Sequence, residues 1–417
     1  MTGLPGNYVN YLILATPSSS SLDPSTFYPE LVPQSGPIEG QYSRRSMQFR
    51  TYGFFSGSIY LLLERAMKYP ETMRPRHSQL RITQLRETLR ALGHKWSEPL
   101  HTTAYRTETH GRYLAPFAPR RRASNRASIP ESDTSANFLV IIDSLCNLEL
   151  LFYAAAHTGY EFLASAAIMH AKTLLKTHLR QETTPADWTP SGSHGYGYNY
   201  DGPLYSTCHV VNFSPATGEV KEIRTAQGYT PESTWSRGQA WAILEYAQAY
   251  SWTKDETFLS AACALAEYFI YRLESAPGCV DKHAERKPET KPDFKNNLTE
   301  PKRTGRYSPI RDVSAGVIAA NGLPILSQAL TWRGRHAQPR WYMNSAIWIV
   351  GDTLALTTAR EQACLRPDLV AGIKAVSASE ALEDCRPFVS TLTGSTVSWN
   401  EDNINASANH GLVYAYY

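Results

Sequence analysis

The chain has 417 residues, 42% hydrophobic and 19% charged, which is typical of a soluble globular protein with one large domain or two ordinary ones. Its formal net charge of +3 is too small to indicate a nucleic-acid-binding protein. The six cysteines are scattered without a C-x-x-C pair, so neither a zinc-binding signature nor a disulfide framework is present.

The N-terminal 46 residues are predicted to form an irregular strap. The apolar run at the start has no Lys or Arg before it and is broken by Pro17, so it reads as neither a signal peptide nor a membrane span. Residues 17–46 are rich in Pro, Ser and Gly, which is typical of a loop. We expect a cytoplasmic enzyme.

Two helices are predicted next, and an irregular segment follows them. An aromatic loop at 49–58, which contains Phe54, leads into a helix at 59–68 that Pro70 ends. Apolar residues at near-helical spacing predict a helix at 78–93, with Gly93 as its terminator. Residues 94–134 carry prolines and the run Arg120-Arg121-Arg122. They read as a solvated basic loop, and no aromatic interleaving supports nucleic-acid binding.

The middle of the chain combines apolar runs with a short strand region. Residues 137–156 are almost continuously apolar, and 160–179 form an amphipathic pattern typical of a helix. The Gly- and Tyr-rich stretch 185–202 is predicted to be a loop. Residues 205–213 read as a short strand, with which 220–225 can pair as a hairpin.

Helical patterns dominate the rest of the chain. Helices are predicted at 236–252, 256–273, 311–330 and about 340–358, with a long loop at 277–310. Successive helices with so little strand leave two architectures, an α-solenoid and a closed barrel of helical hairpins. No repeat with a period of roughly 30 to 50 residues is present, which disfavours the solenoid.

The stretch STWSRGQAW, residues 233–241, offers a possible binding surface for a sugar. Ser233 or Thr234 can cap a helix whose first turn then holds Trp235 and Arg237. The rings of Trp235 and Trp241 can face one space only if the chain bends at Gly238. Sugar rings stack on aromatic faces, and an acid group meets Arg as a planar fork. The alternative reading is a helix start whose tryptophans are core residues.

Asp143 is the candidate catalytic residue. It lies inside a run too apolar to face solvent, where a lone carboxylate is costly unless it is paired or protonated. Burial favours the protonated carboxyl, which suits a group that donates a proton near neutral pH. The alternative reading is a capping or salt-bridged aspartate. His209 could hydrogen-bond a sugar hydroxyl as a neutral imidazole, and Gln227 can both donate and accept hydrogen bonds.

Two phrases resemble glycoside hydrolase family 88, the unsaturated glucuronyl hydrolases. They are STWSRGQAW, preceded by Gln227-Gly228-Tyr229, and NFLVIIDSLCNLELLFYAAAHTG at 137–159. The resemblance implies an all-α (α/α)6 barrel formed by 1–417 as a single domain, interrupted by irregular loops at 112–134, 185–202 and 277–310. It implies Asp143 as general acid/base, with substrate-binding residues His209, Gln227, Trp235, Arg237, Trp241, Phe54 and His110.

The resemblance also implies the reaction. The family protonates C4 of a uronate that has a C4=C5 double bond, water adds at C5, and the opened hemiketal expels the neighbouring sugar. The expected partner is an unsaturated uronate-containing oligosaccharide. We expect no metal or other cofactor, no nucleic acid, no membrane, and a monomer or weak oligomer.

Departures from the family pattern weaken the expected activity. The family has an aspartate after a histidine where this chain has His110-Gly111, and a helical stretch where this chain has the basic segment 112–134. The chain ends in HGLVYAYY, a shortened form of a family-like phrase. We therefore expect a barrel incomplete around 94–134 and a weak or inactive hydrolase. The alternatives are an unsaturated rhamnogalacturonyl hydrolase and a non-catalytic sugar-binding relative.

Overall fold

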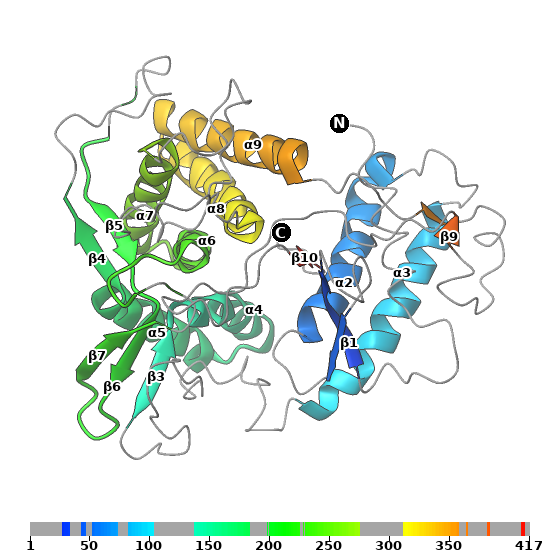
Figure 1. Ribbon diagram of the computed structural model, residues 1–417, viewed down its shortest axis with the longest axis horizontal. Coiled ribbons are helices and arrows are strands. Elements are labelled where there is room, and N and C mark those ends of the chain that lie inside the picture. The colour runs from blue at the N-terminus through cyan, green and yellow to red at the C-terminus, as the bar shows by residue number, and fades with distance from the viewer. Residues whose placement is uncertain are drawn as a thin grey trace, which may run out of the picture. The chain divides into compact units, whose positions relative to one another are not determined.

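The computed structural model groups the chain into two compact units (Figure 1). One contains Met1–Arg112, Thr357–Thr393 and Asn409–Ala415, and the other contains Tyr113–Leu356, Gly394–Ala408 and Tyr416–Tyr417. The single-domain organisation stays a prediction. The structure describes residues 27–33, 43–46, 52–73, 82–103, 137–183, 198, 200–225, 228, 230–275, 312–357, 364–365, 382–383 and 410–412.

The first unit contains two long helices and a small sheet. The helices are α2 (Tyr52–Lys68) and α3 (Ile82–Ser97), each followed by a 3-10 turn, η1 (Pro70–Met73) and η2 (Glu98–Thr103). Strand β1 (Phe27–Pro33) pairs in antiparallel fashion with β2 (Ser43–Ser46) and β10 (His410–Leu412). A separate two-stranded ladder joins β8 (Cys364–Leu365) to β9 (Leu382–Glu383).

Trp96 is the centre of the first unit's core. Its ring meets the rings of Phe55 and Tyr28 edge-on, at centroid distances of 4.8 Å and 5.2 Å. The Tyr28 hydroxyl donates a hydrogen bond to the Trp96 carbonyl at 2.8 Å, which ties β1 to the end of α3. This unit therefore has its own hydrophobic core, separate from that of the second unit.

Three predictions for the first unit are wrong. The predicted strap includes strands β1 and β2, because their backbones find partners on each other. Helix α2 begins at Tyr52, so Phe54 lies in a helix and not in a loop. Gly93 does not end its helix, since α3 continues to Ser97 with Gly93 buried inside it. Most of the segment 94–134 lies outside the described residues.

The second unit contains six α-helices within its described residues, and these form successive hairpins. Hairpin α4–α5 is followed by α6–α7 and α8–α9, which confirms the helices predicted from residue 160 onward. Buried side chains from these helices pack together in one hydrophobic core. The helices are α4 (Leu148–Thr158), α5 (Glu161–Thr177), α6 (Ser236–Thr253), α7 (Glu256–Ser275), α8 (Val313–Trp332) and α9 (Ala337–Thr357).

Two small antiparallel sheets accompany these helices. Strands β3 (Phe138–Ile141) and β7 (Val220–Arg224) both pair with β6 (Val210–Phe213), which confirms the predicted hairpin of β6 and β7. Strands β4 (Leu179–Glu182) and β5 (Leu204–Thr207) form the other sheet. The predicted single strand 205–213 is therefore two strands that belong to different sheets.

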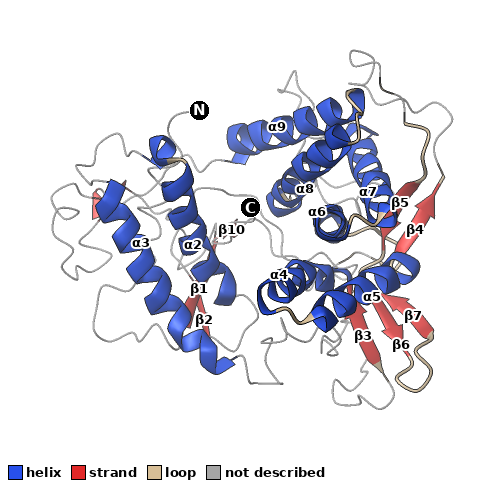
Figure 2. Ribbon diagram, turned by 180° about the vertical axis from the view of Figure 1, so that it is seen from behind, coloured by secondary structure: helices blue, strands red, loops and turns tan. Residues whose placement is uncertain are grey.

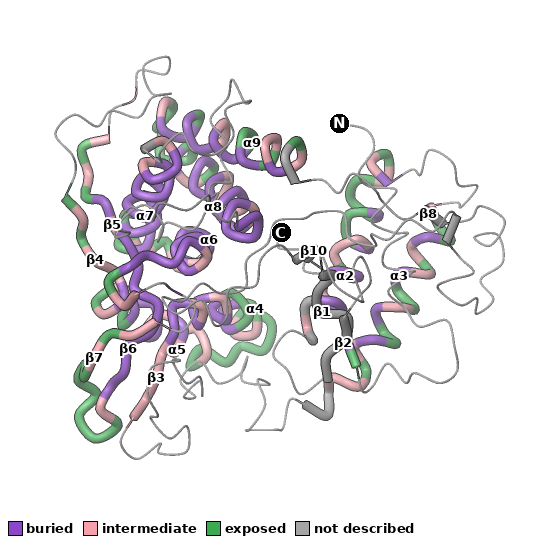
Figure 3. The backbone as a smooth tube through the Cα atoms, in the orientation of Figure 1, coloured by how far each residue is buried: buried purple, intermediate pink, exposed green. Residues whose placement is uncertain are grey.

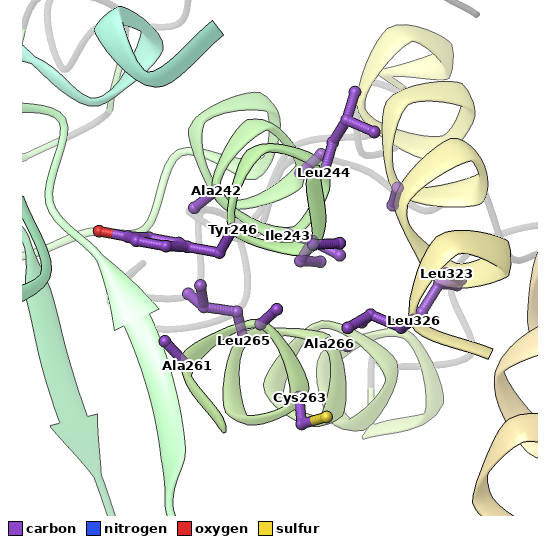
Figure 4. Close-up of a cluster of buried hydrophobic side chains, with 14 of the residues drawn as sticks. Ala242, Ile243, Leu244, Tyr246, Ala261, Cys263, Leu265, Ala266, Leu323 and Leu326 are labelled. Carbon is purple, nitrogen blue, oxygen red and sulfur yellow. The ribbon is translucent and has the colours of Figure 1, made fainter. Parts of the chain in front are cut away.

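Helix α6 occupies the middle of the second unit. Figures 1 and 2 show it surrounded by α4, α5, α7 and α8, and Figure 3 shows it buried along nearly its whole length. A helix that is buried on most sides needs small residues for close approach, and α6 supplies alanines at 240, 242, 247 and 249. Figure 4 shows its side chains packed against those of α7 and α8.

Helices α6 and α8 approach each other at Gly322. A Cβ atom at this position would lie 2.9 Å from the Leu244 Cα atom and from Ile243 Cγ2, so only glycine fits. Helix α8 is also the one described helix with the length and apolar composition of a membrane span, and 67% of that stretch is buried in the protein. Its apolar character serves the core packing against α6.

Candidate active site

The beginnings of α6 and α8 lie together with the turn that precedes α4. A Cβ atom on Gly238 would be 2.8 Å from Cγ2 of Ile142, so the missing side chain allows α6 to rest on this turn. Arg237 in the first turn of α6 pairs with Asp312 directly before α8. Helix N-termini carry partial positive charge, so the place suits an anionic ligand.

Asp143 lies in the 3-10 turn η4 (Ile142–Asn147), between β3 and α4. The apolar run 137–156 thus contains a strand, a 3-10 turn and most of a helix, because β3 pairs with β6 before the turn begins. The Asp143 side chain is 16% exposed. Its Oδ2 atom is buried and has no hydrogen bond to the part of the chain that the structure describes.

His209 faces Asp143. The pair Ile141 and Val210 closes the ladder of β3 and β6, and the Ile142 amide donates to the His209 carbonyl at 2.9 Å. This register brings His209 Nε2 to 3.7 Å from Asp143 Oδ2. The imidazole is buried, its Nδ1 lies 3.3 Å from the Thr225 hydroxyl, and its ring centroid is 4.5 Å from that of Trp235.

Trp235 and Arg237 form the other side of this group. The guanidinium carbon of Arg237 lies 5.0 Å from the Trp235 ring centroid, in cation–π contact. Nε and one terminal nitrogen of Arg237 donate to Asp312 Oδ2 at 3.4 Å and 3.3 Å. Trp235 is only 2% exposed, so it packs as a core residue that supports the arginine rather than as an open stacking face.

The chain does not bend at Gly238, so the condition for the rings of Trp235 and Trp241 to face one space is not met. Helix α6 runs without a break from Ser236 to Thr253, and Trp235 precedes it in extended conformation. Trp241 lies four residues after Arg237, on the same side of the helix, and is partly buried against the core. The helix has no side-chain cap, so the predicted capping by Ser233 or Thr234 is wrong.

Arg180 holds the loop that leads into α6, a role that no local sequence pattern predicts. From β4 its guanidinium donates to the carbonyls of Glu232 at 2.6 Å and Ser233 at 3.2 Å, and to the Thr234 hydroxyl at 3.0 Å. A further bond reaches the Thr207 carbonyl at 2.9 Å. Such a network fixes the backbone immediately before Trp235.

Two buried histidines hold the turn that carries Asp143. His170 Nε2 lies 2.7 Å from the hydroxyl of Ser144, the residue after Asp143. His178 Nε2 donates to the Val140 carbonyl on β3 at 3.1 Å. Burial lowers the pKa of His178 to about 4, although its bond to Val140 acts in the opposite direction. His178 is therefore neutral at ordinary pH and acts as a structural donor.

Three other predicted substrate-binding residues cannot be located beside Asp143 and Arg237. Phe54 lies on α2 in the first unit, and its side chain is outside the described residues, as are Gln227 and His110. Among the described ranges, no three His, Cys, Asp or Glu side chains gather as a metal site. The expectation that no cofactor is needed stays a prediction.

Sequence comparisons link part of the chain to known enzymes. It is 36% identical over 134 residues to an unsaturated glucuronyl hydrolase of Formosa agariphila, a match covering 32% of this chain and 28% of the relative. It is 31% identical over 137 residues to an unsaturated chondroitin disaccharide hydrolase of Streptococcus agalactiae, covering 33% and 29%. The match therefore spans less than a third of these relatives. No protein-family model matches the chain.

Structural comparisons cover far more of the chain. An unsaturated glucuronyl hydrolase specific for heparin aligns with a TM-score of 0.57 at 21% identity, covering 98% of this chain and 91% of that one. The unsaturated glucuronyl hydrolase of Bacillus sp. GL1 aligns over the same shares, with a TM-score of 0.56 at 17% identity. The predicted resemblance is confirmed: the chain is related in part of its sequence to the unsaturated glucuronyl hydrolases and has their all-α, (α/α)6 barrel fold.

Proposed function

We propose that this protein hydrolyses unsaturated uronides, removing a terminal unsaturated glucuronyl residue from oligosaccharides that polysaccharide lyases generate. The observation that carries the proposal is the position of Asp143, whose partly exposed carboxyl group lies 3.7 Å from His209. Trp235 and Arg237 extend this group. The similarity to unsaturated glucuronyl hydrolases supports the same reading.

Asp143 would supply and recover the proton. Its carboxyl group protonates C4 of the substrate, and the ring oxygen stabilises the positive charge that develops at C5. Water then forms a bond to C5 and returns a proton to the Asp143 carboxylate, so one water is consumed. The C5 hemiketal opens by breaking its bond to the ring oxygen, and C1 releases the neighbouring sugar. Asp143 thus both donates and recovers the proton, whereas ordinary glycosidases cleave the glycosidic bond between a pair of carboxylates.

Arg237 would bind the uronate carboxylate. It lies in the first turn of α6, where the helix dipole adds to its own positive charge. A guanidinium matches a carboxylate as a planar donor. In this proposal His209 and Gln227 contact sugar hydroxyl groups, and Trp241 contributes to the binding surface. Phe54 and His110 belong to the first unit, and their part in substrate binding stays a prediction.

A non-catalytic sugar-binding protein is the second candidate. Gly111 stands where the resemblance calls for an aspartate. This difference favours weak turnover, so we expect a rate well below that of a fully equipped enzyme.

The expected cytoplasmic location stays a prediction.

Product analysis tests the proposal. Purified protein is incubated with unsaturated uronyl disaccharides prepared from chondroitin, from heparin and from a rhamnogalacturonan, and products are separated by mass spectrometry. Hydrolysis predicts the free neighbouring sugar together with a uronate fragment, whose summed mass exceeds that of the substrate by one water. The preferred disaccharide identifies the neighbouring sugar. Binding without products would support the sugar-binding alternative, and neither binding nor products would refute both.

A further inference from the structure

We propose that Asp312 is a positioning residue that fixes the guanidinium of Arg237 over the ring of Trp235. The effect of this positioning on substrate binding rests on the proposed function. Asp312 itself is buried, with only 1% of its surface exposed, and so acts through Arg237 without touching substrate.

The two oxygens of Asp312 have different partners. Oδ1 accepts hydrogen bonds from the Ser314 hydroxyl and from the Ala315 amide, the latter at 3.4 Å, and thereby caps α8. Oδ2 accepts from Nε and a terminal nitrogen of Arg237 at 3.4 Å and 3.3 Å. Because the cap fixes the carboxylate to the helix, the other oxygen has a defined position for the arginine.

Arg237 is held from two directions. Asp312 contacts the Nε side of its guanidinium, and the Trp235 ring lies 5.0 Å from its central carbon. Its side chain is 12% exposed, so the ion pair also compensates the charge in a place with little water. An arginine fixed in this way loses less conformational entropy when it binds a carboxylate. The arrangement therefore favours affinity for the substrate.

The pair also fixes the relative position of α6 and α8. Arg237 and Asp312 connect the first turn of one helix to the cap of the other. About three turns further along α8 and two turns further along α6, Gly322 of α8 contacts the backbone of Leu244 in α6. The packing of α6 on α8 therefore defines the backbone position of Arg237, and the ion pair with Asp312 defines the position of its guanidinium.

Asp312→Asn tests the role of the carboxylate. The amide oxygen can still cap α8, whereas the amide group cannot supply the negative charge that Arg237 faces. We expect the KM for an unsaturated uronyl disaccharide to rise about tenfold and kcat to fall less than about threefold, because binding is lost equally in ground and transition states. Asp312→Ser, whose hydroxyl is a good helix cap, should give the same split and serves if the first variant folds poorly.

Asp255 offers a matched control. It stands directly before α7, accepts hydrogen bonds from the Thr257 amide at 3.0 Å and hydroxyl at 2.6 Å, and pairs with Lys172 at 2.9 Å. It thus combines a helix start with an ion pair, as Asp312 does. Asp255→Asn should leave KM unchanged. An equal rise in KM for both variants would show a general loss of stability and overturn the positioning role.

A double-mutant cycle shows whether Asp312 acts through Arg237. In an Arg237→Gln background, Asp312→Asn should raise KM by less than about twofold, because the group that it positions is gone. A further tenfold rise in that background would overturn the proposal.

An NMR measurement separates this inference from the proposed function. The Arg237 Nε–H signal, assigned by its loss in Arg237→Lys, should shift and exchange faster with solvent in Asp312→Asn but not in Asp255→Asn. A protected, Asp312-dependent signal in a protein without turnover would support the positioning and refute only the hydrolase activity. An unchanged signal in Asp312→Asn would overturn the positioning even if the enzyme is active.

Discussion

Nε2 of His209 lies 3.7 Å from Oδ2 of Asp143, although the two residues are far apart in sequence. Strands β3 and β6 produce this contact, because their antiparallel register ends at Ile141 and Val210, directly beside both residues. The candidate active site is therefore built on a strand pair that leads into helices. Its geometry depends on how β3, the η4 turn and the start of α6 are held together.

Arg237→Lys should weaken substrate binding. Lysine keeps the charge but loses the planar fork and the Nε donor that contacts Asp312. We expect the affinity for an unsaturated uronyl disaccharide to fall by about 1–3 kcal/mol, measured by calorimetric titration. Lys172→Arg, at a surface ion pair, serves as the control. Unchanged affinity would mean that another group binds the carboxylate.

Gly238→Ala should destabilise the protein and disturb the site. The new Cβ atom would lie 2.8 Å from Ile142 Cγ2 and 3.0 Å from Trp235 Cε3, so the helix, the Ile142 side chain or the Trp235 ring must shift. We expect a loss of about 1–3 kcal/mol in the free energy of unfolding, measured by urea titration.

Gly351→Ala provides the comparison for this change. Gly351 lies within helix α9, and a Cβ atom there would meet no atom within 4 Å. Alanine should stabilise the protein by about 0.4–1 kcal/mol because it restricts the unfolded chain. Similar stability changes for the two variants would contradict the close packing at Gly238.

His178→Gln should alter the pH dependence of stability. The folded-state pKa of about 4 lies below the ordinary 6.5, so the unfolded chain binds this proton first as pH falls. The wild-type protein therefore loses stability below about pH 6.5, and glutamine removes that loss while keeping a donor for Val140. Relative to the variant, the wild-type free energy of unfolding should fall by about 2 kcal/mol between pH 7.5 and 5. A constant difference over this range would show that His178 does not titrate as inferred.

Glu267→Gln should give the opposite slope. Burial raises the pKa of Glu267 to about 7 from the ordinary 4.5, although hydrogen bonds with Tyr198 and Tyr342 act against this. The folded state then keeps the proton that the unfolded state releases, so this contribution is present at low pH and is lost as pH rises through about 7. Relative to the variant, wild-type stability should rise by about 2–3 kcal/mol from pH 8 to 5. Urea titrations at several pH values check the sign, and a fall would contradict it.

The helices of the second unit were predictable, but the turn that carries Asp143 was not. Helices α5 to α9 have apolar periodicity and clear interruptions between them. By contrast, the apolar run from Phe138 to Leu145 fits a buried strand as well as a buried helix, and periodicity alone does not distinguish the two. Its pairing partner β6 lies about 70 residues later, and only that pairing decides the outcome.

The residues of the candidate site were predictable only in part. The phrase 233–241 marks Trp235 and Arg237, and the resemblance adds Asp143 and His209. The partner of Arg237 is Asp312, which lies 75 positions later and has no local signal. Arg180 likewise acts through bonds to carbonyl groups more than 50 positions away. Contacts of this kind arise from the packing of helices and strands and are absent from local sequence patterns.

The absorbance of the conjugated uronate tests the central claim, that Asp143 is the acid/base of a uronide hydrolase. An unsaturated uronyl disaccharide is followed in the near ultraviolet with wild-type protein and with Asp143→Asn, which keeps the shape but cannot cycle a proton. We predict a slow loss of absorbance with the wild type and a rate lower by about 10²–10⁴-fold in the variant, with binding retained. Equal rates in the two proteins, or a stable absorbance in the wild type, would contradict the account.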